Sequence, residues 1–366
     1  MRKSIAAMAA VMVLTVAVAA GGAYFYVEDR KNAEYDLDKR VPMSELYFKD
    51  YDDTPYSEAL YYQFEIGDGS DFFCHFLYGD IGFGIKYFGV DYKLFTPGEK
   101  PVFFGTQFDT DESSMSKASF QWKVGGNSAG GDADEQRIHI VSGPLKVDVT
   151  LETVVPYYQV GDGGMMYLDD EREEWGKLTI YPHFKVTGKI LNGSTVIDVD
   201  GWGYGNKIVQ AFDPRKLSDF HTALRWQKNG VGFDVHDYYT PEDNEWLPVL
   251  MVYKDGRMIH VSQDYTKENL EYFVEPKSGR KVPTSYRVVS EGDDIKVTIE
   301  FTDVSASDYN DPLMSLGRIQ KAVINLFADP PIDLRFDGHV KFVIETPEYK
   351  VVEEGPGHGL ALVAVD

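Results

Sequence analysis

Apolar and polar side chains alternate along most of this chain, and this two-residue period is the feature that most limits its fold. The run at 60–66 places apolar side chains on one face, and the run at 72–78 repeats the pattern after a Gly-Asp-Gly-Ser turn at 67–70. Such runs around a turn predict a β-hairpin, because successive side chains of a strand point to opposite faces. A second hairpin with an Asp-Gly turn is predicted at 253–258.

Similar alternating runs recur at 147–151, 178–186, 247–251 and 295–301. Short strands with frequent glycine are typical of antiparallel barrels or sandwiches, whereas a βαβ fold needs a helix between strands. The exception is 312–330, where apolar residues recur at helical spacing and a proline stands in the first turn. Strand-like runs at 339–344 and 360–365 follow it. We therefore expect an all-β fold with one C-terminal helix.

Two interruptions of the pattern suggest how the chain is divided. The stretch 157–175 is rich in glycine and then strongly acidic, which predicts a long surface excursion. The glycine-rich stretch at 198–205 is the more plausible domain boundary, and it separates 46–200 from 201–366. Each part has about the size of one eight-stranded barrel, which is just wide enough to be filled by side chains or to hold one small ligand. The expected architecture is two antiparallel β-barrels in tandem.

The amino terminus carries a run without charge at 5–27, preceded by Arg and Lys. This length suits a membrane-spanning signal-anchor helix, and the small residues at 17–19 also suit a secretory signal peptide. Both alternatives place the positive residues before the run, so the body is predicted to be extracytoplasmic, either anchored to the membrane or secreted. We assign 1–30 to this segment and the polar residues 31–45 to a tether.

The chain is strongly acidic, with a formal net charge of −23. Phosphate backbones repel such a surface, so nucleic-acid binding is excluded. A single cysteine, Cys74, excludes an intramolecular disulfide and a thiolate zinc site. No two of the eight histidines have the spacing of a helical zinc motif. The sequence therefore predicts neither a metal site nor a cofactor.

Three aromatic stretches follow one another in a recognisable order. The first is the hairpin at 61–80, and the second is Gly-Trp-Gly-Tyr at 201–204 followed by Phe-His and Leu-Arg-Trp within 220–226. The third, at 246–257, is a strand with an early proline that leads into a Lys-Asp-Gly turn. The ordered set resembles the tandem-lipocalin (calycin) family that includes carotenoid 1,2-hydratases, AttH-like proteins, the yeast survival-factor type and fungal Diels–Alderases. The resemblance implies two lipocalin-like barrels and an apolar ligand.

The chain departs from this family in a short run of residues on which acid–base chemistry would depend. In the family, Gly-x-Gly-Tyr is usually followed by a His-Asp-His run, but residues 205–207 here read Gly-Asn-Lys. An amide cannot shuttle a proton as a carboxylate can, and both imidazoles are missing. Hydratase activity therefore does not follow from the resemblance. If the chain is an enzyme, the resemblance implies a hydratase (a lyase) or an isomerase or cyclase.

Polar and aromatic residues in the resembling stretches are the candidates for a site. The polar and catalytic candidates are Asn206, Lys207 and His221. A lone histidine on a strand is, however, also typical of a hydrogen-bonded structural residue, and alternating glycines are also typical of a strand that passes close to another backbone. Aromatic platforms with one orienting amide are expected to bind the ligand, and these candidates are Tyr62, Phe64, Trp202, Tyr204, Asn206 and Trp226.

Three functions remain open from the sequence. The first is a membrane-associated or secreted protein that binds an apolar ligand, a lipid or isoprenoid, in an aromatic-lined barrel. The second is an isomerase, cyclase or hydratase that acts on a polyene or isoprenoid in the same cavity. The third is a carbohydrate-binding interaction protein with exposed aromatic side chains. Polar residues that converge in a dry pocket would favour the enzyme, and a flat exposed aromatic strip would favour the carbohydrate binder.

Overall fold

The computed structural model describes residues 37, 40–51, 56–67, 69–80, 86–159, 164–167, 175–211, 220–239, 246–276, 279, 281–310 and 332–363. The leader at 1–30, the acidic run at 169–174 and the helix expected at 312–330 lie outside these residues. In the described ranges the helices are two 3-10 turns, η1 (Met43–Leu46) and η2 (Thr110–Glu112). Neither of them has the length or the apolar content of a bilayer-crossing helix. The other regular elements there are strands.

The described chain forms two compact units, residues 40–211 and 220–363, each built on one antiparallel sheet. This boundary falls later than the one expected from the sequence. Residues 200 and 201 lie inside β12 (Thr195–Ala211), which pairs with β1 (Tyr56–Ile66) over the length of β1. The glycines of this stretch continue the alternation of the strand, so the first unit extends to the end of β12.

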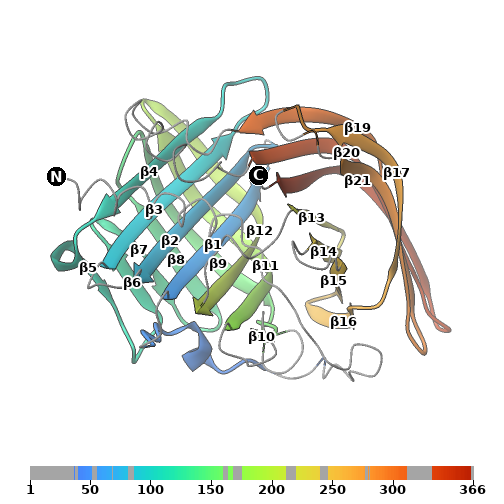
Figure 1. Cartoon of the computed structure of the whole chain (residues 1–366), viewed down its shortest axis with the longest axis horizontal. Coiled ribbons are helices and arrows are strands. Elements are labelled where there is room, and N and C mark those ends of the chain that lie inside the picture. Colours follow the sequence, from blue (N-terminus) through green and yellow to red (C-terminus); the bar gives the residue numbers. More distant parts are fainter. Residues whose placement is uncertain are drawn as a thin grey trace. The chain divides into compact units, whose positions relative to one another are not determined.

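The first unit is a nearly closed barrel (Figure 1). Its strands follow the order β4-β3-β2-β1-β12-β11-β9-β8-β7-β6-β5, with β10 beside β11. The hairpin predicted at 60–78 is formed by β1 and β2, and part of the excursion expected at 157–175 is the short strand β10. The remaining strands are β2 (Asp71–Asp80), β3 (Lys86–Phe95), β4 (Val102–Phe108), β5 (Ser113–Met115), β6 (Gln121–Val124), β7 (Asn127–Gly131), β8 (Glu135–Ile140), β9 (Leu145–Val155), β10 (Met165–Tyr167) and β11 (Trp175–Asn192).

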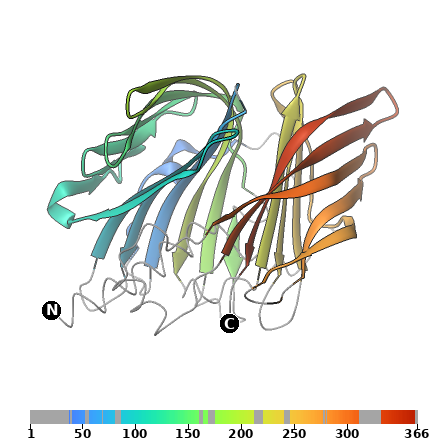
Figure 2. The ribbon, with the colours of Figure 1, turned by 90° about the horizontal axis from the view of Figure 1, so that it is seen from above.

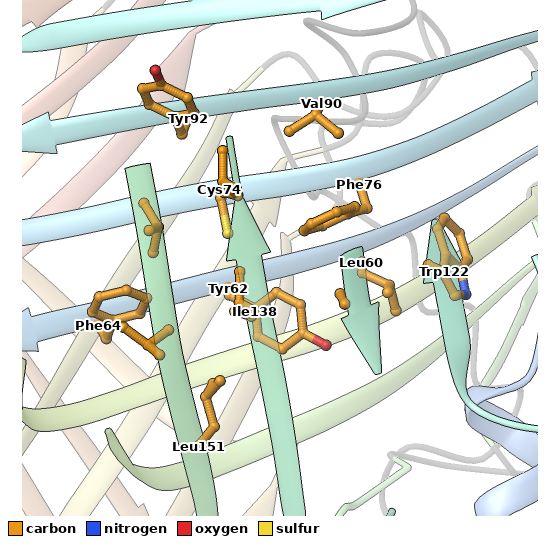
Figure 3. Close-up of a cluster of buried hydrophobic side chains, with 14 of the residues drawn as sticks. Leu60, Tyr62, Phe64, Cys74, Phe76, Val90, Tyr92, Trp122, Ile138 and Leu151 are labelled. Atoms are coloured by element: carbon orange, nitrogen blue, oxygen red, sulfur yellow. The ribbon is translucent and has the colours of Figure 1, made fainter. Parts of the chain in front are cut away.

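Side chains of the first unit fill the inside of its own barrel. Figure 3 shows Tyr62 and Cys74 among the aromatic and aliphatic side chains that project inward from facing strands. Tyr62, Tyr92 and Trp122 are almost completely buried. Such close packing stabilises the barrel through burial of apolar surface, at roughly 25 cal/mol per Å². The interior of this barrel is therefore a core.

The alternating glycines of β12 explain how this strand enters the barrel wall. A Cβ atom on Gly201 would lie 1.9 Å from the backbone oxygen of Glu65. A Cβ atom on Gly205 would meet the Tyr181 ring at 2.7 Å. The alternative reading of these glycines, a strand that passes close to another backbone, is therefore correct.

The second unit is a half-barrel, which corrects the expectation of two closed barrels (Figures 1 and 2). Its sheet follows the order β16-β15-β14-β13-β21-β20-β19-β18-β17, and the end strands β16 and β17 do not pair among the described residues. The hairpin predicted at 253–258 and the run at 339–344 are present as strands, as is the final run as far as residue 363, the last described residue. The bounds are β13 (Phe220–Lys228), β14 (Val231–Tyr239), β15 (Trp246–Lys254), β16 (Arg257–Ser262), β17 (Thr266–Val274), β18 (Lys281–Glu291), β19 (Lys296–Asn310), β20 (Ile332–Glu345) and β21 (Lys350–Val363).

Candidate functional site

A row of four polar side chains crosses the outward face of the first sheet. In strand register, Asn206 of β12 lies opposite Tyr61 of β1, Tyr61 lies opposite His75 of β2, and His75 lies opposite Asp91 of β3. Their chain neighbours, such as Tyr62 and Cys74, belong to the barrel core. Since adjacent residues of a strand point to opposite faces, the row projects away from that core.

His75 and Asp91 form a buried pair at the centre of this row. The two atoms His75 Nδ1 and Asp91 Oδ1 are 2.5 Å apart, and His75 is only 2% exposed. A carboxylate on one ring nitrogen fixes the orientation and tautomer of an imidazole, which leaves the other nitrogen to act as a base or an acid. No described residue gives His75 Nε2 a hydrogen-bond partner. The arrangement can therefore exchange a proton with a bound molecule.

Aromatic and amide groups surround the histidine on the β1 and β12 side. The Tyr61 ring lies 4.9 Å from the His75 ring, centroid to centroid, and 6.2 Å from the Tyr204 ring. Asn206 Nδ2 donates a hydrogen bond to the Tyr204 hydroxyl at 3.3 Å. Two of the predicted ligand-binding residues, Tyr204 and Asn206, therefore adjoin Tyr61, which lies between their strand and His75.

Apolar side chains and one lysine line the same face next to Asp91. Lys93 follows Asp91 by two residues on β3 and lies opposite Phe73 of β2. Desolvation lowers the pKa of Lys93 to about 8, and the nearby Asp91 carboxylate opposes this shift. Phe73 and Leu77 are both buried. The site thus combines a proton-exchanging pair, one cation and a desolvated apolar surface.

Lys207, a predicted catalytic residue, faces the opposite way from its neighbour Asn206. Its ammonium forms a buried ion pair with Glu58, at 2.8 Å, and donates to the backbone oxygens of Glu45 and Tyr47. Burial lowers the pKa of Lys207, and the Glu58 carboxylate opposes the shift. These bonds connect η1 and the residue after it to β12, and the ion pair connects β12 to β1. We therefore assign Lys207 a structural role.

His221, the third catalytic candidate, belongs to a polar cluster of the second unit. His221 Nε2 lies 3.0 Å from His236 Nδ1, and His236 Nε2 lies 2.8 Å from Asp234 Oδ1. Arg225 Nε lies 3.2 Å from the same oxygen. Asn206 and Lys207 thus lie on opposite faces of one strand, and His221 lies in another unit. The three candidates do not form a single site in either unit.

The remaining aromatic candidates have different surroundings. Tyr62 and Phe64 belong to the core of the first barrel, where the Tyr62 hydroxyl donates to Gln136 Oε1 at 2.8 Å. Trp226 belongs to the core of the second unit and donates from Nε1 to the Pro356 carbonyl at 2.9 Å. Trp202 lies on the outward face of β12, with its ring 6.1 Å from that of His183. Among the described residues, none of these four forms a ring contact or a hydrogen bond with His75.

Comparison with known proteins identifies the relatives of this scaffold. A family model described as the Svf1 family matches residues 18–319, most of the chain. The chain belongs to the Svf1 family. No curated protein sequence matches this Svf1-family chain.

Three solved structures share the fold of this Svf1-family chain. An AttH-like protein from Nitrosomonas europaea has 13% identity and a TM-score of 0.60, over 93% of this chain and 99% of that one. Kievitone hydratase from Nectria haematococca has 11% identity and a TM-score of 0.54, over 94% and 98%. CghA, solved with Sch210972, has 10% identity and a TM-score of 0.58, over 85% and 89%. These likenesses confirm the resemblance to tandem lipocalin-like proteins.

The sequence pattern did not identify His75, Asp91 and Lys93 as candidate site residues of this Svf1-family chain. The alternation alone already places His75 on the face opposite Cys74, and Asp91 and Lys93 on one face of their strand. It does not give the register between β2 and β3, which makes the pair. In the described part of the chain, no cluster of three or more His, Cys, Asp or Glu side chains could hold a metal ion.

Proposed function

We propose that this chain binds an apolar small molecule, of lipid or isoprenoid type, beside His75 and acts on it by acid–base catalysis. The observation that carries the proposal is the buried pair of His75 and Asp91. No described residue forms a hydrogen bond with the Nε2 atom of His75. A buried polar atom without a partner costs about 1–3 kcal/mol, so such an atom calls for a ligand or a role. Positioned acid–base groups of this kind accelerate reactions by about 10²–10⁴-fold.

The reaction that fits is hydration of a double bond conjugated to a carbonyl group, or migration of such a bond. In hydration, His75 Nε2 accepts a proton from water while the water oxygen bonds to the β-carbon of the substrate. The electron pair of the double bond moves towards the carbonyl oxygen, where the Lys93 ammonium can stabilise the negative charge. The imidazolium then returns its proton to the α-carbon. All atoms of water are thus in the product, and His75 is regenerated.

The fold relatives support a reaction of this class. Kievitone hydratase is named for the addition of water, and CghA was solved with the small molecule Sch210972. The desolvated apolar surface formed by Phe73 and Leu77 suits a hydrophobic substrate, because burial of apolar area favours binding. Low polarity also strengthens the electrostatic interactions of His75 and Lys93 with charge that develops during the reaction.

The test uses the purified full-length chain with methyl farnesoate and methyl geranate, two unsaturated isoprenoid esters, in H₂¹⁸O. We expect a product that has gained one labelled water, detected by mass spectrometry. His75→Gln is expected to lower its rate of formation at least about 100-fold, and Asp91→Asn is expected to lower it less. The matched control is His139→Gln on β8, because the side chain of His139 is half exposed. Equal rates for the wild type and His75→Gln would contradict the catalytic role.

A second candidate is a binding protein without catalysis, which the near-complete burial of His75 favours. Organic extracts of the purified protein would then contain a stoichiometric lipid or isoprenoid, and His75→Gln would retain it. Extracts free of such compounds from several expression hosts would count against this candidate. The carbohydrate-binding alternative has less support, because the exposed aromatic side chains in the described ranges, Tyr51 and Tyr272, lie in different units.

The extracytoplasmic location and the contact with a membrane through residues 1–30 are further parts of the proposal, based on the sequence alone. Alkaline-carbonate extraction of membranes tests the anchor, and amino-terminal sequencing of the mature protein tests cleavage. Recovery of the intact chain from the cytoplasmic fraction would refute both alternatives.

A further inference from the structure

Buried polar contacts connect the start of β17 to two other strands of the second unit, β13 and β14. Lys267 donates to Asp237 and, at 3.3 Å, to Thr222 Oγ1. The Tyr265 hydroxyl donates to the His236 carbonyl at 3.2 Å. Because Thr222 belongs to β13 and Asp237 to β14, these buried bonds tie the start of β17 to the other side of the sheet. Breaking such a buried ion pair is strongly destabilising.

Apart from these polar contacts, one edge of β17 has no strand partner among the described residues. Among the described strands it pairs with β18 alone. Its later residues Leu270, Tyr272 and Val274 are exposed, although edge strands usually carry charges that prevent unwanted association. These three exposed apolar side chains lie within five residues and form an apolar stretch of the edge, with Glu271 among them.

A hollow of ≈620 Å³ lies beside this edge. Phe336, which belongs to the core of the unit, lines it together with Phe273, and their ring centroids are 6.1 Å apart. Val304 and Thr284 also line the hollow. The volume falls within the range of small-molecule pockets, roughly 300–1,000 Å³. The hollow thus has the size of a ligand site, and its lining combines apolar and polar side chains.

Two charged residues at the same hollow indicate the polar group of the ligand. Glu271 Oε2 accepts a hydrogen bond from the Ser285 hydroxyl at 3.0 Å. Lys281 is exposed, and no described residue forms an ion pair with it. The cation is therefore available to a ligand, whereas the carboxylate already has a hydrogen-bond partner.

We propose that this hollow is a second binding site, which takes the hydrocarbon chain of an anionic amphiphile and pairs its head group with Lys281. The chain lies against Phe273, Phe336 and Val304, and the exposed residues of β17 cover its side. The site is independent of the acid–base pair in the first unit. Its head-group chemistry, a carboxylate or a phosphate, is shared by free fatty acids and by lipid phosphates.

Displacement of a fluorescent fatty acid from the full-length protein tests the site, with oleate, oleyl phosphate and oleyl alcohol as competitors. We expect oleate to bind two- to fivefold more tightly than the uncharged alcohol, as for an exposed ion pair. Lys281→Gln is expected to abolish that difference, and Thr284→Trp to weaken both ligands more than tenfold by filling the hollow. If Thr284→Trp does not fold, Tyr272→Glu provides the same test from the exposed edge, because its charge repels the anion.

Matched controls lie on the same unit away from the hollow. Lys341→Gln removes an exposed lysine that pairs with Glu300, and Val352→Trp enlarges an exposed apolar residue of β21. Both are expected to leave oleate affinity unchanged. The displacement assay does not measure formation of the labelled product, so failure here is distinguishable from failure of the catalytic proposal. Equal affinity for oleate and oleyl alcohol, or unchanged binding to Thr284→Trp, would overturn the proposal. Tighter binding of oleyl phosphate would identify a phosphate head group.

Discussion

The two faces of the strands β1, β2, β3 and β12 carry different chemistry on neighbouring residues. Inward, Tyr62 and Cys74 pack in a filled core; outward, one residue away, Tyr61 and His75 belong to a polar row with a proton-exchanging pair. A strand thus gives stability on one face and a candidate site on the other. The difference shows that a barrel whose interior is filled can still carry a candidate site on the outer face of its wall.

The largest effect on stability is expected from the inward ion pair. Lys207→Met or Glu58→Gln leaves one charge buried without its partner, which costs about 3–5 kcal/mol of the free energy of unfolding. The double substitution is expected to recover part of this loss. Urea denaturation measures the change, with Lys189→Met as control, because its pair with Asp198 is exposed. If the free energy of unfolding falls as little as it does in the control, the inward ion pair does not contribute more to stability than an exposed pair.

A smaller effect, dependent on pH, is expected from His183 next to Trp202. Burial lowers the pKa of His183 from 6.5 to about 4 in the folded chain. Between pH 6.5 and 4 the unfolded chain therefore binds more protons, so stability falls as the pH falls. We expect a loss of about 2 kcal/mol between pH 7 and pH 5. Urea denaturation at both values should show a weaker pH dependence for His183→Gln; an identical dependence would contradict the shift.

Tyr61 and Tyr62 allow the most direct comparison of the faces. Tyr62→Phe removes the donor to the buried Gln136, which costs about 1–2 kcal/mol of stability. Tyr61→Phe removes a half-buried hydrogen bond to Gln63, at 3.0 Å, and is expected to cost less. Thermal unfolding of the two variants ranks them. The reverse order would mean that the outward row contributes more to stability than the core hydrogen bonds.

The smallest effect is expected at Tyr181. Its ring is fully buried, and no described residue forms a hydrogen bond with its hydroxyl. Tyr181→Phe removes a polar atom without a partner, so stability should stay within about 0.5 kcal/mol of the wild type or rise slightly. A clear decrease in stability, measured by thermal unfolding, would indicate that this hydroxyl has a hydrogen-bond partner such as an ordered water.

The local pattern of the sequence predicts much of this fold. Alternation predicts the β1–β2 hairpin and identifies Cys74 as a buried residue, because the two-residue period decides which face a side chain takes. The same pattern cannot give register, so Tyr61, His75 and Asp91 could not be recognised as one row. Nor could it show that β16 and β17 do not pair with each other among the described residues, since the position of β17 depends on contacts of Tyr265 and Lys267 with strands more than twenty residues away.

The pairing of β1 with β12 also has a consequence for synthesis of the protein. Ser57 finds its strand partner at Gln210, so one side of β1 stays incomplete until most of the first unit has left the ribosome. Contacts between residues so far apart in the chain slow folding and expose apolar strand edges in the meantime. A nascent chain of this kind is a natural client for chaperones that shield open edges.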